Sequence, residues 1–136
     1  MKWLRKEATL ENLNSMIDFV LKNAENDVQL SKKKAMEIRL ICEELLINII
    51  SYSYPKEKGD IIAIYEFNDN CITLSLCDYG IKFNPVEEHI EPDLSRDIMD
   101  IDVGGLGILI VKKVSDYINY ERVDNMNILT VKKYCC

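Results

Sequence analysis

Residues 61–78, "IIAIYEFNDNCITLSLCD", alternate with a period of two, which predicts a β-hairpin. Both arms, 61–68 and 71–78, are rich in β-branched and aromatic residues, as strands are. Asp69 and Asn70 lie between the arms and are residue types that favour a tight turn. An antiparallel strand pair is therefore expected at the centre of this chain.

Helical periodicity lies on both sides of this hairpin. The longest helix is predicted over residues 31–55, "SKKKAMEIRLICEELLINIISYSYP", with Ser31 as its N-cap and Pro55 as its stop. An earlier helix is expected to begin after Thr9, which could cap it. A third helix is expected over residues 108–113, which are aliphatic and then basic.

The outer segments complete the predicted order of elements. A short edge strand is expected at residues 2–8, and a second hairpin over 117–133 turns at Asp124 and Asn125. A long loop, residues 79–103, precedes the third helix and is typical of a functional lid. This order predicts a two-layer α+β sandwich, with helices on one face of a mixed, mostly antiparallel sheet.

Composition favours one domain, residues 1–136, because 136 residues with 48% hydrophobic content suit a single core. No apolar run is long enough to span a bilayer and the N-terminus does not resemble a signal peptide, so a cytoplasmic protein without membrane contact is expected. Residues 59–136 carry seven Lys or Arg against fourteen Asp or Glu, which argues against nucleic-acid binding. The five cysteines form no CxxC pair and there is one histidine, so reduced thiols are expected in place of a zinc site.

Two polar residues continue apolar rows of the predicted strands. Asp78 follows the parity of Leu74 and Leu76, and Asn127 shares the parity of Leu129 in the last strand. A buried carboxylate needs a hydrogen-bond donor such as an amide, a water or a ligand's amino group. The alternative is that the strand ends before Asp78, which then only caps the turn.

Glu44 and Asn48 are four residues apart in the long helix and face the same way, beside its apolar stripe. Their oxygen atoms could coordinate magnesium or orient a nucleophile. The neighbouring Glu43 is expected to be solvated. Spacing alone leaves open an ordinary polar flank of the helix.

Three glycines, Gly104, Gly105 and Gly107, precede the third helix. Free N–H groups and the positive end of the helix dipole converge at such a terminus, which can bind an anion such as phosphate. A tight turn before a buried helix is the alternative interpretation.

Three segments together resemble the N, G1 and G2 boxes of GHKL (histidine kinase-like) ATPases: "EELLIN" at 43–48, "DYGIKFNP" at 78–85 and "GGLGILIVKKVSD" at 104–116. The "PDL" at 92–94 and the closing "YERVDNMNILTVKK" at 120–133 are similar to the anti-sigma factor serine/threonine kinase branch. The resemblance covers about residues 30–133 and implies the Bergerat ATP-binding fold.

The resemblance also implies roles for individual residues. Glu44 would be the catalytic base that activates a serine hydroxyl of a partner protein, and Asn48 would ligate Mg²⁺. Asp78 would accept a hydrogen bond from the amino group of adenine. The other nucleotide-binding positions would be Gly80, Gly104, Gly105, Leu106, Gly107 and Asn127, the last of which stands where relatives often have threonine.

The implied function is an ATP- and Mg²⁺-dependent kinase that phosphorylates an anti-sigma factor antagonist of the STAS type and could also bind a sigma factor or form a homodimer. The alternative is a catalytically weak binding module whose affinity for a partner protein depends on the bound nucleotide. Two features depart from the pattern: Tyr52 stands where relatives commonly have histidine, and residues 100–103, "DIDV", stand where many have a basic residue. Arg96 is the one arginine of the predicted lid that could contact the γ-phosphate. A dinucleotide oxidoreductase is poorly supported, because "GGLGIL" lacks the last glycine of GxGxxG.

Overall fold

The computed structural model describes residues 1–86 and 103–135. Within these ranges the strands are β1 (Lys2–Glu7), β2 (Asp60–Asn68), β3 (Cys71–Asp78), β4 (Tyr117–Val123) and β5 (Met126–Tyr134). The helices are the short 3-10 turn η1 (Leu10–Asn12) and the α-helices α1 (Leu13–Asp27), α2 (Lys32–Tyr52) and α3 (Val103–Val114). The predicted order of strands and helices is confirmed.

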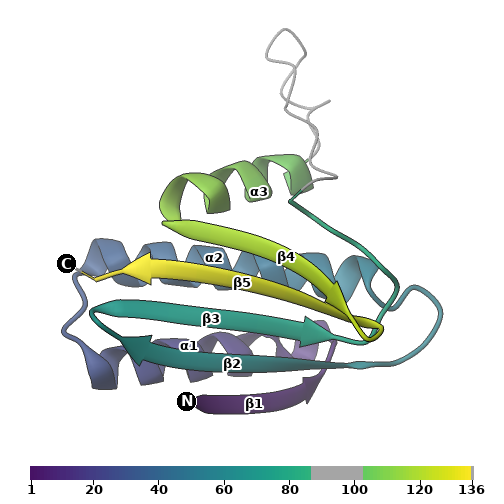
Figure 1. Ribbon diagram of the computed structural model, residues 1–136, viewed down its shortest axis with the longest axis horizontal. Coiled ribbons are helices and arrows are strands. Elements are labelled where there is room, and N and C mark those ends of the chain that lie inside the picture. Colours follow the sequence, from purple (N-terminus) through teal and green to yellow (C-terminus); the bar gives the residue numbers. More distant parts are fainter. Residues whose placement is uncertain (87–102, 136) are drawn as a thin grey trace, which may run out of the picture.

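The strands form one sheet in the order β1-β2-β3-β5-β4 (Figure 1). Every neighbouring pair among them is antiparallel. The chain leaves β3, passes through α3, forms the edge strand β4 and returns as β5 beside β3. This crossover brings the ends of two distant hairpins together in the middle of the sheet.

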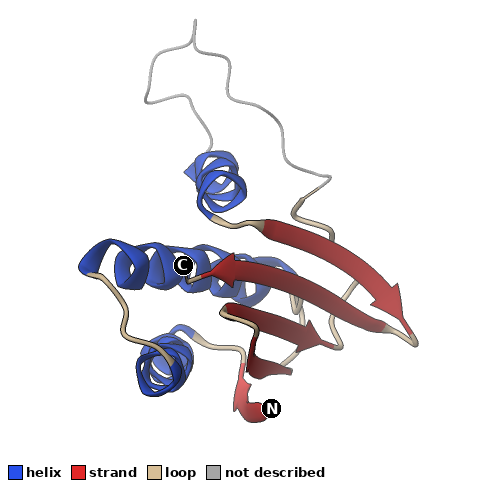
Figure 2. Cartoon of the chain, turned by 60° about the vertical axis from the view of Figure 1, so that its left-hand side comes forward, coloured by secondary structure: helices blue, strands red, loops and turns tan. Residues whose placement is uncertain are grey.

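The helices cover one face of the sheet, as Figure 2 shows from the side. The core between the two layers takes its largest side chains from α1, α2 and the inward faces of β2 and β3, among them Met16, Leu45, Leu46, Tyr65 and Leu76, each at most 2% exposed. Burying such side chains stabilises the fold by about 1.5–3 kcal/mol each before entropy is counted. The predicted α+β class is confirmed, but the described sheet is wholly antiparallel and not mixed.

Both predicted hairpin turns are confirmed. Asp69 and Asn70 have φ values of 52° and 58°, and Asp124 and Asn125 have 49° and 64°. Two consecutive left-handed residues are the mark of the type I′ turn, whose twist matches that of the flanking strands. Asp and Asn tolerate this backbone better than most side chains, which explains why these pairs predicted the turns.

The two predicted helix caps have different outcomes. Ser31 caps α2, because its side chain accepts a hydrogen bond from Lys34 N at 3.1 Å. The prediction for Thr9 is wrong: its side chain makes no cap hydrogen bond, and η1 intervenes before α1. Asn12 Nδ2 donates to the carbonyl of Glu7 at 2.9 Å and ties this tight turn to the end of β1.

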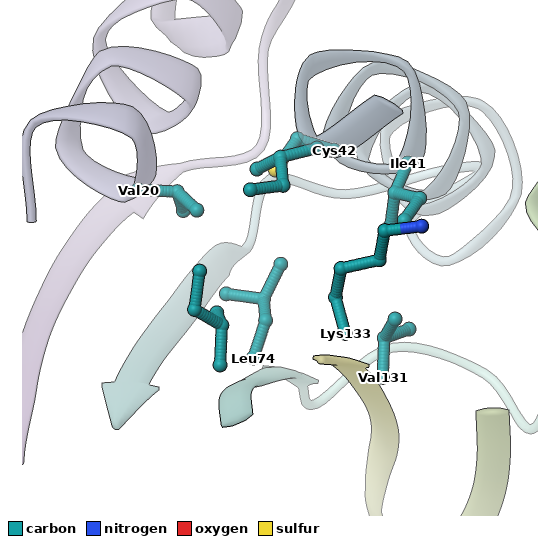
Figure 3. A pocket seen from close by; sticks show the side chains of 8 residues that line it. Val20, Ile41, Cys42, Leu74, Val131 and Lys133 are labelled. Atoms are coloured by element: carbon teal, nitrogen blue, oxygen red, sulfur yellow. The ribbon is translucent and has the colours of Figure 1, made fainter. Parts of the chain in front are cut away.

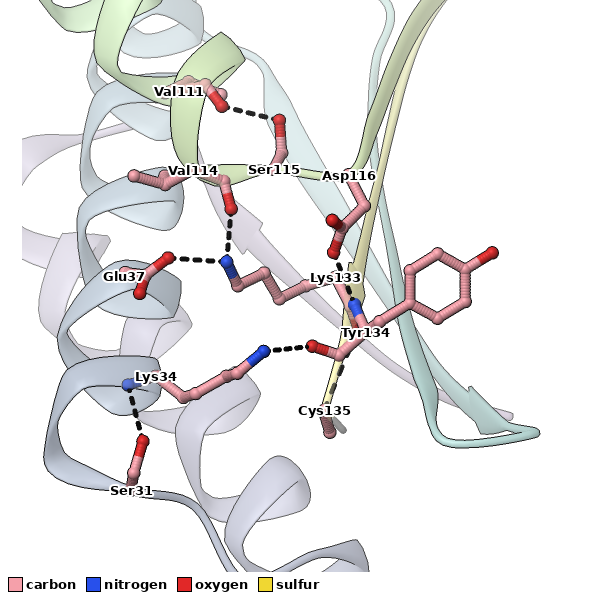
Figure 4. Close-up of polar contacts among 10 residues, drawn as sticks. All are labelled: Ser31, Lys34, Glu37, Val111, Val114, Ser115, Asp116, Lys133, Tyr134 and Cys135. Carbon is pink, nitrogen blue, oxygen red and sulfur yellow. Dashed lines mark hydrogen bonds and ion pairs between the residues drawn. The ribbon is translucent and has the colours of Figure 1, made fainter.

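A buried lysine holds the C-terminal end of α3 (Figure 4). Lys133 on β5 is 8% exposed, and its Nζ lies 2.5 Å from Glu37 Oε2 on α2. The same Nζ donates to the carbonyl of Val114, the last residue of α3. A cation at a helix C-terminus satisfies an otherwise unpaired carbonyl and opposes the negative end of the dipole. Lys133 therefore connects α3 to α2 and to the sheet.

Most of the predicted lid lies outside the described residues, including the "PDL" segment and Arg96. In the ranges that the structure describes, no helix is long and apolar enough to cross a membrane.

Candidate functional site

One end of the sheet gathers buried polar side chains. β3 ends at Asp78, which lies opposite Asn127 near the start of β5. α2 ends and α3 begins at this same end of the molecule, on the right in Figure 1. Strands β3, β4 and β5 and the end of α2 meet around these two side chains, whereas the start of α3 meets α2 farther along, at Glu44.

Asp78 is buried on the inner face of the sheet, as its parity predicts. It is 2% exposed and pairs with Ile61 of β2 as well as with Asn127. The alternative that the strand ends before this residue is wrong, because β3 includes Asp78. Its Oδ1 accepts hydrogen bonds from Gly80 N and Asn127 Nδ2, both at 2.9 Å.

The environment of the Asp78 carboxyl raises its pKa. Burial is the largest cause, because a charge is poorly solvated inside the protein. Hydrogen bonds from Asn127, Gly80 and Ser53, together with the charge of Arg122, lower the pKa and offset part of this effect. A carboxylate that is buried and still ready to accept a hydrogen bond is typical of a binding site.

Asn127 is also buried, at 2% exposed, so the prediction that it points inward is confirmed. Its Nδ2 donates to Asp78 and, at 2.7 Å, to the carbonyl of Ile81. Its Oδ1 accepts from Tyr120 Oη at 2.5 Å and from Arg122 Nη1 at 3.1 Å. Asn127 thus joins the end of β3 to the edge strand β4.

The turn after Asp78 lies directly on the C-terminal end of α2. Ile81 N donates to the carbonyl of Ser53 at 2.9 Å. A Cβ on Gly80 would lie 2.1 Å from that same carbonyl oxygen, so only glycine allows this approach. Ser53, 2% exposed, also hydrogen bonds with Asp78. The position of Gly80 is therefore set by packing against α2.

Glu44 and Asn48 lie on α2, on the N-terminal side of Ser53 and toward the place where the start of α3 packs on this helix. Asn48 is 7% exposed, and its Nδ2 donates to the carbonyl of Glu44 at 2.8 Å. No donor in the described part of the chain reaches its Oδ1. A buried amide oxygen without a donor suits a hard cation such as Mg²⁺, so the residue fits a metal ligand.

Glu44 is half-buried, as is Glu43 beside it. The carboxylate of Glu44 has no hydrogen-bond or ion-pair partner within residues 1–86 and 107–135. Partial burial, and then the charge of Glu43, raise the pKa of Glu44. A raised pKa brings a carboxylate closer to the range in which it can act as a general base.

The start of α3 meets α2 at Glu44. A Cβ on Gly107 would lie 1.8 Å from Glu44 Oε2, so the glycine makes room for this carboxylate. α3 begins at Val103, and Gly104, Gly105 and Leu106 occupy its first turn. The N–H groups of a helix's first turn have no partner inside the helix and are available to an anion.

A separate small cavity in the core is unrelated to these residues (Figure 3). It encloses about 20 Å³ and is lined by apolar side chains such as Val20, Ile41 and Leu74, with the stem of Lys133 at its edge. This volume admits about one water molecule, and the lining offers few polar partners. The cavity cannot hold an organic ligand.

Comparison with known proteins assigns the chain to a family. The sequence model of the histidine kinase-like ATPase domain matches residues 6–133. The chain belongs to this family. The family contains the GHKL ATPases that the sequence motifs resemble, so the resemblance is confirmed.

Curated relatives of this histidine kinase-like domain include two kinases. The serine-protein kinase RsbW of Bacillus thuringiensis is 22% identical over 99 residues, which are 71% of this chain and 62% of RsbW. The serine/threonine-protein kinase BtrW of Bordetella bronchiseptica is 25% identical over 105 residues, which are 76% of this chain and 73% of BtrW. The chain thus matches less than two thirds of the length of RsbW.

Solved structures confirm the fold. The catalytic domain of histidine kinase ThkA superimposes with a TM-score of 0.58 at 17% identity, covering 99% of this chain and 97% of that domain. The histidine kinase AdeS of Acinetobacter baumannii gives a TM-score of 0.53 at 15% identity, covering 99% of this chain and 69% of AdeS. The architecture is therefore that of a histidine kinase-like catalytic domain.

Sequence reasoning missed three residues of this site. Ser53 and Arg122 contact Asp78 or its donors, and Tyr120 contacts Asn127. The parity of β4 gave a signal for Arg122, which lies opposite Asn127 and hence on the inner face. Ser53 directly follows α2, and a polar residue at the end of a helix gives no signal of a functional role.

Proposed function

We propose that this protein binds Mg-ATP at the end of the sheet and is a serine/threonine protein kinase of the anti-sigma factor type. The observation that carries the proposal is the arrangement along α2: the buried acceptor Asp78 lies at its C-terminal end, and Asn48, Glu44 and the N-terminus of α3 follow toward its middle. Family membership and kinase relatives support it. The protein would act in the cytoplasm.

Each residue has a part in nucleotide binding. Asp78 would accept a hydrogen bond from the amino group of adenine, with Gly80 and Asn127 around the base. The N–H groups at residues 104–107 would hold the phosphates, as helix N-termini do. Asn48 Oδ1 would ligate Mg²⁺, which would supply positive charge to the phosphates in this acidic protein.

Glu44 on α2 and Ser53, the residue that caps its C-terminus, lie nine residues apart, about 13 Å along the helix axis. The base-binding end and the reacting end of the site are therefore separated, as an extended nucleoside triphosphate requires. In phosphoryl transfer the serine oxygen of a partner protein forms a bond to the γ-phosphorus, the bond to the β-phosphate oxygen breaks, and ADP leaves. Glu44 would take the proton of the serine hydroxyl.

The protein substrate is proposed to be an anti-sigma factor antagonist of the STAS type, and a sigma factor a second partner. A homodimer is compatible with the proposal. This part of the proposal is supported by the kinase activity of the relatives RsbW and BtrW and by the family resemblance.

The test is incubation of the purified protein with [γ-³²P]ATP, Mg²⁺ and a STAS-type antagonist from the same organism. We expect label on a serine of the antagonist, and we expect E44Q to bind ATP but to transfer at least about 10²-fold more slowly. A matched control is Glu43→Gln, which changes the neighbouring carboxylate. If the antagonist co-elutes with the protein only in the presence of nucleotide and carries no label, the protein is a nucleotide-dependent binding module and not a kinase.

A further inference from the structure

The side-chain amide of Asn127 has a single possible orientation. Both of its N–H groups are used, on Asp78 Oδ1 and on the carbonyl of Ile81. Its oxygen accepts from Tyr120 Oη, from Arg122 Nη1 and, at 3.5 Å, from Phe83 N. A flipped amide would put its oxygen against two acceptors and its N–H groups against three donors, so the contacts assign the orientation.

Arg122 holds two of the three groups that donate hydrogen bonds to Asp78. Its Nη1 donates to the carbonyl of Gly80 at 2.9 Å and to Asn127 Oδ1 at 3.1 Å. At their other ends, Gly80 N and Asn127 Nδ2 both donate to Asp78 Oδ1. The guanidinium of Arg122 therefore donates to the carbonyl oxygens of Gly80 and Asn127, and the N–H groups of the same two residues donate to Asp78. Hydrogen bonds connected in this way strengthen one another.

This arrangement fixes what the pair offers to a ligand. Asn127 has no N–H left to donate, and Asp78 as a carboxylate can only accept. A base with an exocyclic amino group can donate to this carboxylate. A base with a carbonyl at the same place puts acceptor against acceptor, which is penalised in a buried site.

We infer that Arg122 is a positioning residue that locks Asn127 and the Gly80 turn around Asp78 and thereby sets the preference of the site for an adenine base over a 6-oxopurine. The inference rests on the proposed function, because it takes ATP as the ligand. Arg122 is half-buried on the edge strand β4 and acts through Asn127 and Gly80.

Without the guanidinium, Asn127 Oδ1 loses a charged donor and the carbonyl of Gly80 loses its side-chain partner. Asn127 and the Gly80 turn are then held less firmly, so the Asp78 carboxylate can shift and discriminates less against a 6-oxo group. The expected effect is a change in selectivity between bases, beyond any general weakening of affinity.

The experiment measures dissociation constants for ATP and for inosine triphosphate by calorimetry with Mg²⁺ present. The two ligands have the same triphosphate and differ in the amino or oxo group on the base. Wild type is compared with R122M, with R122Q and with R39M. Arg39 lies exposed on α2 and is the control for loss of one positive charge.

We expect wild type to prefer ATP by about tenfold or more, and R122M to reduce this ratio at least about fivefold, with R39M unchanged. Equal weakening of both ligands in R122M, with the ratio kept, would overturn the inference. If R122M does not fold, R122Q decides in the same way, because glutamine is too short to reach both carbonyl groups. Absence of ATP binding in wild type would overturn the proposed function itself.

Discussion

Glu44 Oε2 lies 1.8 Å from the point that a Cβ on Gly107 would occupy, so the carboxylate fills the space of the missing side chain. The glycine is buried inside α3, where glycine costs about 1 kcal/mol relative to alanine. This cost is compensated by the close approach of α3 to α2. The contact ties the proposed base to the helix whose N-terminus would hold the phosphates.

Gly107→Ala should slow phosphoryl transfer without weakening the fold. The obstacle is the end of a flexible side chain, so Glu44 can swing aside and α3 gains helix propensity. We expect an unchanged or higher melting temperature, ATP affinity within a few fold of wild type, and phosphoryl transfer slower by about 10², because the base is displaced by about 1 Å or more. Single-turnover transfer to the antagonist measures the effect.

The control for this substitution is Ile110→Ala on the exposed side of the same helix, at 39% exposed. It changes α3 without touching Glu44. Normal transfer rates in Gly107→Ala would show that the position of the Glu44 carboxylate over this glycine is unimportant for the reaction.

Asp78→Asn should abolish ATP binding without weakening the fold at neutral pH. Burial raises the pKa of Asp78 above its unfolded value of roughly 3.9, so the folded state keeps the proton over a range in which the unfolded state has lost it. The free energy of unfolding of wild type therefore falls as pH rises through this range and is constant above it. Asparagine removes this contribution.

The measurement is urea unfolding of wild type and Asp78→Asn from pH 4 to pH 8, with calorimetric titration of ATP at pH 7.5. We expect the stability of the variant relative to wild type to increase with pH and then to level off. Retained micromolar ATP affinity would remove Asp78 from the base-binding site, and a stability difference independent of pH would show that burial does not perturb this carboxyl.

The sequence predicted those parts of the fold that depend on local chemistry. The turns at Asp69 and Asp124 need left-handed backbone that Asp and Asn accept, and the period of two placed Asp78 on the inner face. The prediction that Thr9 caps the first helix was wrong because a 3-10 turn, held by the side chain of Asn12, replaces the expected helix start. Local patterns do not report such a competing contact.

The network behind Asp78 could not be predicted, because it depends on which strands are neighbours. Arg122 reaches Gly80 across 42 residues of sequence only because β5 lies between β3 and β4. Hairpin patterns pair β2 with β3 and β4 with β5, and they do not say how the two hairpins join. Ser53 likewise meets Asp78 only through the packing of α2 on the turn at Gly80.

Asn48→Ala should lower the dependence of ATP binding on Mg²⁺. Asn48 Oδ1 is a buried oxygen without a donor in the described residues, and alanine removes it while leaving the helix intact. We expect removal of Mg²⁺ by EDTA to weaken ATP binding strongly in wild type and by a much smaller factor in the variant. Calorimetry with and without EDTA gives both factors, and identical factors would mean that another group holds the metal.

Lys133→Met should destabilise the protein through its contacts with α2 and α3. Lys133 Nζ lies 2.5 Å from Glu37 Oε2, with side chains 10% and 17% exposed, and it also caps the carbonyl of Val114. Removing one partner leaves the Glu37 carboxylate poorly solvated, which costs about 3 kcal/mol in buried pairs. In a domain of this size the melting temperature should fall by about 10 °C.

Replacing both partners tests the cause. In Lys133→Met with Glu37→Met no charge is left behind, so we expect much of the lost stability to return. Arg5→Ala is the control for an exposed pair, because the Arg5 and Asp60 side chains are 55% and 38% exposed, and it should leave the melting temperature almost unchanged. If the single and double variants melt at the same temperature, the loss comes from the freed end of α3 and not from the unpaired carboxylate.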